Sequence, residues 1–487
     1  MTDNLKIIPK RPTHQSVAVH QERRQLIKTF WLAVTLLFLV ELYTLQTNSI
    51  ASITGAILIA FAALLPIYLW VSGLALGMPI FPLFSMTFLW TYALPLLSEN
   101  PKIITYSPDD IFFASVTVTG FLLLGTFTWL QFVKFPPPFP KYYRALKGQD
   151  SEVFFLFIFT IGILFNMSSV GGWFDLDSGI FALIRGIISG LNILSAFVLS
   201  YRCGTRELAK TKSNIFFALL ALHIITSAAS LLLVSALSIF LLSALAFVVG
   251  RRQVPWLLII LVLICLLPLH YGKDEMREKY WKGDETHLVQ PWEYPAWYAE
   301  WIGYSFKSLN TNESQKVKQQ SVLERASLMQ LLLITEVETP KKVSYLSGKT
   351  YAFIPNLLVP RILNSKKVRS HEGTSLLNIH YGTQTRSATL KTTIGWGLLN
   401  ESYANYGLSG CAALAVILGA VYGQAARWSM NTPLLSYRSL LAVLLMSFSF
   451  QSEFSAGVYV AALFQSFVPL LVITFIFMKE HRIQKLH

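Results

Sequence analysis

Apolar runs long enough to cross a lipid bilayer recur along most of this 487-residue chain. Hydrophobic residues make up 53% of it and charged residues only 14%, which leaves too little polar surface for a soluble globule. About 20 apolar residues in a helix span the hydrocarbon core, because each residue adds about 1.5 Å along the helix axis. The sequence therefore predicts an all-α polytopic membrane protein.

Twelve of these runs are expected to be transmembrane helices. They cover 29–45, 51–72, 79–97, 111–133, 152–169, 181–200, 214–231, 232–249, 255–271, 407–426, 438–453 and 457–478. Twelve spans place both termini on the same side of the membrane. The continuous apolar region 215–249 leaves two interpretations open: two helices joined by a buried turn, or one span followed by a re-entrant segment.

Lys and Arg are distributed unevenly between the two sides of this predicted topology. Twenty-one lie in the tails and short loops of one side, whereas the short loops of the other side hold only Lys102. Short loops rich in Lys and Arg remain in the cytoplasm. We therefore expect cytoplasmic tails at 1–28 and 479–487, without a cleaved signal peptide. The same distribution accounts for much of the net charge of +14 without nucleic acid as a partner.

The residues between the ninth and tenth spans form one outer segment, 272–406. It is too long and too rich in apolar residues for a linker, so we expect a folded, largely helical cap between helices 1–9 (29–271) and helices 10–12 (407–478). Its aromatic run at 291–306, PWEYPAWYAEWIGYSF, has two interpretations. The rings either form a belt at the membrane interface or stack on sugar faces.

Several kinds of chemistry find no support in the sequence. The three cysteines, Cys203, Cys265 and Cys411, form no CxxC pair, so neither a disulfide nor a thiolate metal site is expected. The histidines show no ligand spacing such as HExxH, and no glycine-rich phosphate loop precedes a helix in a polar region. We therefore expect no metal and no cofactor.

The end of the cap is rich in cations. Residues 355–407 carry Arg361, Lys366, Lys367, Arg369, Arg386 and Lys391 against two carboxylates, Glu372 and Glu401. Such an excess of positive charge favours a large anion over a neutral solute as the partner of this segment.

The order of motifs here resembles that of a known family. Arg325 is followed by Thr339-Pro340, by YLSGKTY at 345–351, by IPNLLVPR ending at Arg361, and by TTIGWGLLNESYANYGLSG at 392–410. The chain is similar in these features to the Wzy-type oligosaccharide repeat-unit polymerases of bacteria, which are related to O-antigen ligases. PIFPLF at the third span and the long late loop also fit. After the Pro-Arg pair, however, ILNSKKVRS stands where the family has a run like Trp-Pro-x-Lys-Pro.

The resemblance implies a metal-independent glycosyltransferase of the GT-C class in the bacterial inner membrane. It would polymerise polyprenyl-diphosphate-linked oligosaccharides at the periplasmic face, among membrane lipid, alongside a chain-length regulator and a flippase of the same pathway. Two alternatives stay open. One is a transferase like the O-antigen ligases, and the other is a non-enzymatic transporter or assembly protein for lipid-linked glycans.

Such a transfer without a metal needs cations to neutralise the departing diphosphate and a carboxylate to activate or align the acceptor hydroxyl. We expect Arg361 and Arg386 to hold the diphosphate, and Glu401, or else Glu372, to act on the hydroxyl. Glu401 has a second interpretation as a carboxylate that stabilises the N-terminus of the span starting near Gly407. Arg361 also has a second interpretation, as a partner in an ion pair within the cap.

Further substrate contacts are expected nearby. The candidates are Arg325, Lys366, Arg369, His371, Tyr403, Asn405 and Arg185. Arg185, at the outer start of the sixth span, contacts either substrate or lipid phosphates. Glu453, between the last two spans, is either a member of the site or a solvated hairpin residue. A dominant role for His371 would favour the ligase alternative.

Overall fold

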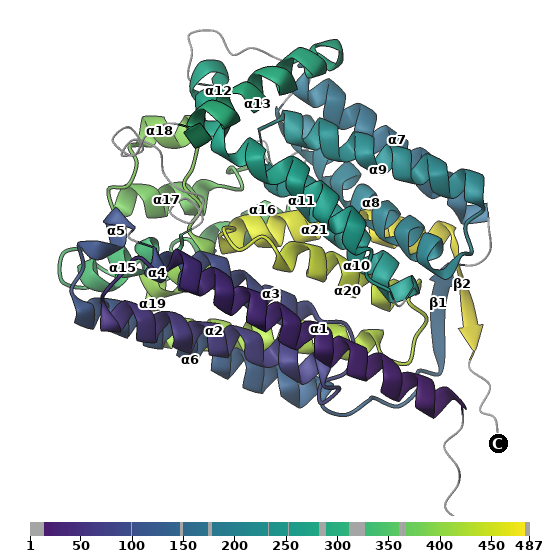
Figure 1. The fold of residues 1–487 in the computed structure, drawn as a ribbon, viewed down its shortest axis with the longest axis horizontal. Coiled ribbons are helices and arrows are strands. Elements are labelled where there is room, and N and C mark those ends of the chain that lie inside the picture. The colour runs from purple at the N-terminus through teal and green to yellow at the C-terminus, as the bar shows by residue number, and fades with distance from the viewer. Residues whose placement is uncertain are drawn as a thin grey trace, which may run out of the picture.

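The computed structural model describes residues 14–98, 100–146, 150–173, 178–231, 233–251, 253–281, 289–310, 327–359, 364 and 367–482. These residues are almost wholly helical, as predicted (Figure 1). The only sheet among them pairs two antiparallel strands, β1 (Tyr142–Leu146) and β2 (Met478–Arg482).

A helix lies over each of the twelve expected spans. They are α1 (His14–Thr44), α2 (Ile50–Val71), α3 to α4 (Ile80–Leu97), α6 (Pro108–Val133), α7 (Asp150–Val170), α8 (Ser178–Thr205), α9 (Lys210–Ala229), α10 (Leu233–Arg251), α11 (Trp256–Tyr271), α19 (Gly397–Ser429), α20 (Tyr437–Ser449) and α21 (Ala456–Ile476). Within the described residues, nine of them are long and apolar enough to cross a membrane. The apolar helical stretches in α10, α11 and α20 are shorter, so the count of twelve spans stays a prediction.

The spans form two groups (Figure 1). One contains α1, α2, α3, α6 and α19, and the other contains α7, α8, α9, α10 and α11. Helices α20 and α21 lie between the groups, with α20 packing on α3 and α19, and both helices packing on α8. Glycines allow the backbones of α6 and α19 to approach each other closely. A Cβ atom added to Gly419 of α19 would lie 2.6 Å from the carbonyl oxygen of Gly125 in α6.

The continuous apolar region 215–249 folds as two helices. Helices α9 and α10 pack against each other, joined by a short turn that includes Leu231 at a φ of 58°. This is the arrangement of the first interpretation, but the apolar stretch in α10 is shorter than the nine candidate spans, so its crossing of the membrane stays a prediction.

The third span is interrupted, but not at the two prolines of PIFPLF (79–84). Pro79 precedes α3 (Ile80–Phe88) and Pro82 lies in its first turn, where a missing N–H costs no hydrogen bond. The irregularity is a π-turn, η1 (Leu89–Ala93), which leads into α4 (Leu94–Leu97) at Pro95. Pro95 cannot donate to the carbonyl of Thr91, and that carbonyl instead accepts a hydrogen bond of 2.9 Å from the backbone N–H of Leu328.

The cap consists mostly of short helices. They are α12 (Lys273–Trp281), η2 (Pro291–Glu293), α13 (Tyr294–Asn310), α15 (Met329–Glu338), η4 (Tyr351–Phe353), α16 (Ile354–Leu358), α17 (Glu372–His380) and α18 (Arg386–Lys391). A further short helix, α5 (Pro101–Ile104), precedes α6. Helices α5, α15, α17 and α18 lie at one end of the molecule, and the β1–β2 sheet lies at the other (Figure 1). The N-terminal end of α1 lies at the same end as the sheet, as an even number of crossings requires.

Gly407, where the tenth span is predicted to begin, interrupts helix α19. Helix α19 continues on both sides of this residue, but Gly407 itself has φ 62° and ψ −147°, which kinks the helix there. Residues 397–406 therefore form a separate first part of α19, directed into the cap. A Cβ at Gly407 would also lie 2.9 Å from the hydroxyl oxygen of Tyr345, so only glycine fits here.

Candidate functional site

Two arginines of the cap share one carboxylate. Glu372 is the first residue of α17, where the helix dipole favours a negative charge. Its Oε1 accepts a hydrogen bond of 2.6 Å from Nη1 of Arg386, the first residue of α18, and its Oε2 lies 3.6 Å from Nη2 of Arg369. The arginine side chains are 55% and 40% exposed, against 18% for Glu372. Both guanidinium groups are thus held in place and remain open to a ligand.

His371 and Arg185 adjoin this pair. His371 precedes α17 directly, and its Nδ1 lies 3.4 Å from the hydroxyl oxygen of Thr393. Desolvation lowers the pKa of His371, and the positive charges of Arg185 and Arg369 lower it further. His371 and Arg185 are nevertheless both exposed. We call Arg185, Arg369, His371, Glu372 and Arg386 the cation cluster.

Glu401 lies behind the cation cluster and has no exposed surface. Its Oε2 accepts a 2.5 Å hydrogen bond from the backbone N–H of Ala456, the first residue of α21, and so caps that helix. Its Oε1 faces Gly373 of α17, 3.9 Å from the position of an added Cβ atom. In this structure Glu401 stabilises a helix N-terminus, but that of α21 rather than its own. Its catalytic role stays a prediction, because direct contact with substrate requires α17 to move.

Asn405 and Tyr403 are also buried. The side chain of Asn405 bonds Thr350 Oγ1 at 2.8 Å and accepts from the backbone N–H of Gly348 at 2.9 Å, which fastens the loop 345–351 to α19. Tyr403 is 6% exposed and belongs to the main apolar core. Neither side chain reaches the surface of the cation cluster. Three other candidates, Arg325, Arg361 and Lys366, lie outside the described residues.

Most of the aromatic run forms a core. Tyr294, Trp297 and Trp301 are at most 7% exposed and pack with the end of α11, and Trp301 donates through Nε1 to the carbonyl of Leu269 at 2.7 Å. Both sequence interpretations, a membrane belt and a sugar platform, are therefore wrong for these three rings. Helical spacing alone does not separate a buried aromatic face from an exposed one.

Trp292 and Phe306 of the run are exposed, at 72% and 61%. Trp292 stacks on Trp173, which is 51% exposed, with the ring centroids 6.5 Å apart. Gln290 fixes the pair by accepting from Trp173 Nε1 and by donating to the carbonyl of Gly171 at 2.9 Å. Trp173 was missed in the sequence, although a lone tryptophan after two glycines at the end of a span was a signal for an exposed ring.

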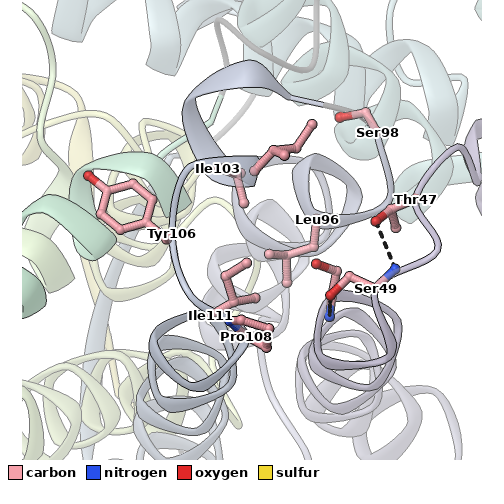
Figure 2. A pocket seen from close by; sticks show the side chains of 10 residues that line it. Thr47, Ser49, Leu96, Ser98, Ile103, Tyr106, Pro108 and Ile111 are labelled. Carbon is pink, nitrogen blue, oxygen red and sulfur yellow. Dashed lines mark hydrogen bonds between the residues drawn. The ribbon is translucent and has the colours of Figure 1, made fainter.

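A small cavity of about 210 Å³ lies elsewhere, where α2, α4, α5 and α6 meet (Figure 2). Its wall combines hydroxyl groups with apolar side chains, and none of the ten lining residues is charged. Two of the hydroxyl oxygens already accept hydrogen bonds from backbone N–H groups. Ser49 caps α2 in this way, and Thr47 accepts from the N–H of Ser49 (Figure 2). This cavity is therefore not a site for a diphosphate.

The titratable residues do not form a metal site in the described part of the chain, where no three His, Cys, Asp or Glu side chains are close enough to hold an ion. Comparison of the chain with protein-family models, with curated proteins and with solved structures finds no match.

Proposed function

We propose that this chain is a membrane-integral glycosyltransferase that polymerises polyprenyl-diphosphate-linked oligosaccharide repeat units in the bacterial inner membrane. The observation that carries the proposal is the cation cluster. Three arginines from α8, α18 and the segment before α17 surround a surface-exposed histidine at the cap end of a membrane-embedded helical bundle. A diphosphate attached to a membrane lipid is an anion that reaches such a place.

A phosphate group can share or replace Glu372 as the partner of the two arginines. The side chains of Arg386 and Arg369 are 55% and 40% exposed, so a diphosphate can reach both of them. Hydrogen bonds to charged groups contribute about 1.5–3 kcal/mol, and a guanidinium can make two of them to one phosphate. Glu372 thus keeps two like charges together until the diphosphate binds, and the arginines then neutralise the leaving group.

His371 is the specific observation that favours a second candidate, a ligase that transfers a finished glycan to another acceptor. Its ring is exposed beside the arginines, and the low pKa keeps it neutral, so it can accept a proton. In the polymerase proposal His371 only contacts the substrate. The Trp173–Trp292 pair offers exposed rings for glycan contacts in either case.

The test is polymer length in cells that lack the endogenous protein. The variants are Arg369→Ala and Arg386→Ala, with membrane levels checked for each. Arg144→Ala is the matched control, because Arg144 is 38% exposed and paired with Glu480, but lies in β1 at the opposite end. We expect wild type and Arg144→Ala to restore a ladder, and each cluster variant to leave mainly single repeat units.

Other outcomes separate the alternatives. A full ladder with both cluster variants would contradict the diphosphate site. A normal ladder that is no longer joined to its final acceptor in Arg369→Ala, Arg386→Ala or His371→Ala cells would favour the ligase. Loss of glycan export with no change in ladder length would favour a transporter or assembly protein. Association with a chain-length regulator and a flippase is part of the polymerase proposal and is tested by co-purification.

A further inference from the structure

Glu453 is a carboxylate that the cation cluster does not include. It lies in the turn between α20 and α21, two residues before Ser455, the N-cap of α21. Its backbone is fixed, because its carbonyl accepts a 3.2 Å hydrogen bond from the N–H of Gly397. Its side chain is exposed. The turn thus presents a carboxylate from a rigid backbone.

Protein surrounds Glu453 on most sides despite this exposure. Desolvation raises the pKa of Glu453 above its ordinary value, and the charges of Lys273 and Arg277 on α12 act in the opposite direction. The carboxylate of Glu453 therefore has protein around it and also surface that a ligand can reach.

One short segment, 392–396, connects Glu453 to the cation cluster. The side chain of Thr393 contacts His371, and a Cβ added to Gly395 would lie 2.8 Å from the Cβ of Glu453. Thr393 and Gly395 are two residues apart, which is at most about 7 Å along the chain. His371 and Glu453 therefore both pack against the same short stretch of backbone, and Glu453 adjoins the cation cluster.

We propose that Glu453 is the catalytic base that receives the proton of the acceptor hydroxyl, an inference that rests on the proposed glycosyl transfer. The hydroxyl oxygen attacks the anomeric carbon of the donor sugar and forms the new glycosidic bond. The bond from that carbon to the diphosphate oxygen breaks, and the diphosphate leaves with the electron pair, held by Arg369 and Arg386. The hydroxyl proton passes to the Glu453 carboxylate. Glu401, buried and bonded to the N–H of Ala456, positions α21 behind this site.

The experiment uses purified full-length protein in lipid vesicles with a synthetic short-chain polyprenyl-diphosphate oligosaccharide as donor and acceptor. Single-turnover transfer is followed by mass spectrometry, and donor binding is measured separately. The variants are Glu453→Gln, Glu453→Asp and Glu401→Gln. Glu480→Gln is the matched control, because Glu480 is 49% exposed, bears an ion pair and lies in β2.

We expect Glu453→Gln to lower the transfer rate by about 100-fold or more while donor affinity stays within about twofold of wild type. Glu453→Asp keeps the base and should recover part of the rate. For wild type, Glu401→Gln and Glu480→Gln, the rate should rise with pH as the base loses its proton, whereas Glu453→Gln should lose this rise. Desolvation moves this rise to higher pH, and the positive charges of Lys273 and Arg277 on α12 move it to lower pH.

Two results overturn the inference while leaving the proposed function intact. One is transfer by Glu453→Gln at the wild-type rate. The other is loss of the pH-dependent rise in Glu401→Gln but not in Glu453→Gln, which would assign the base to Glu401. Absence of transfer by the wild type, with donor still bound, would overturn the proposed function itself.

Discussion

Burial divides the acidic residues of the cap region by role. Glu401 has no exposed surface and bonds a helix N-terminus, Glu372 bonds two arginines, and Glu453 is exposed beside the segment 392–396. Sequence position placed Glu401 nearest to the chemistry, because it lies in a motif close to the membrane. Which carboxylate faces solvent depends instead on how α17, α19 and α21 pack together.

The cap that Glu401 provides makes a prediction about stability. Glu401→Ala leaves the N–H of Ala456 without its acceptor in a buried site, which costs about 1–3 kcal/mol. Glu401→Gln keeps an oxygen that can accept and should lose less. Thermal unfolding of the detergent-solubilised variants measures both changes. Equal melting temperatures for wild type and Glu401→Ala would show that this hydrogen bond does not stabilise α21.

The site could be predicted from the sequence only in part. Residues close in the sequence, such as Arg369, His371, Glu372 and Arg386, were expected together because they share one polar segment, and the structure places them together. Arg185 joined them through its position at the outer start of a span. The partners of Glu401 and the surroundings of Glu453 were beyond the sequence, because both come from contacts between distant segments, Ala456 with Glu401 and Gly395 with Glu453.

At the scale of elements, helix positions followed from apolar length, but helix breaks did not follow from proline alone. Pro82 fits the first turn of α3, whereas Pro95 accompanies the π-turn at Leu89–Ala93. The effect of a proline depends on whether a helix carbonyl loses its N–H donor there. The carbonyl of Thr91 loses its donor at Pro95 and accepts from the N–H of Leu328 instead. The buried aromatic face of α13 was likewise set by its packing on α11, which the spacing of its rings does not reveal.

The contact between α6 and α19 depends on glycine, and this can be tested. A Cβ at Gly419 would lie 2.6 Å from the backbone oxygen of Gly125, so Gly419→Ala must push the helices apart, at a cost of about 1–3 kcal/mol. Gly120→Ala is the matched control in α6, because nothing lies within 4 Å of a Cβ there. Melting of both variants in detergent measures the effect. A Gly419→Ala protein as stable as Gly120→Ala would contradict this close packing.

At the scale of the whole molecule, the two ends of the bundle differ in chemistry. The cap end holds the cation cluster and Glu453, whereas the opposite end holds the β1–β2 sheet and both ends of the described chain (Figure 1). The excess of Lys and Arg in the short loops predicts that the sheet end is cytoplasmic, which places the cluster outside. A lipid-linked donor and a growing glycan would then meet on the face where the polymer is exported.

Cysteine labelling tests this orientation. Lys342→Cys reports the cap end, where the native side chain is 69% exposed, and Arg144→Cys reports the sheet end. The background protein carries Cys265→Ser, because Cys265 is exposed whereas Cys203 and Cys411 are buried. A membrane-impermeant maleimide should label Lys342→Cys in intact spheroplasts and Arg144→Cys only after permeabilisation. Labelling of both positions from outside would contradict the placement of the sheet and the cap on opposite sides of the membrane. The reverse pattern would place the cation cluster in the cytoplasm. The proposed polymerase uses a donor that has already been moved to the outer face, so this result would contradict the polymerase proposal.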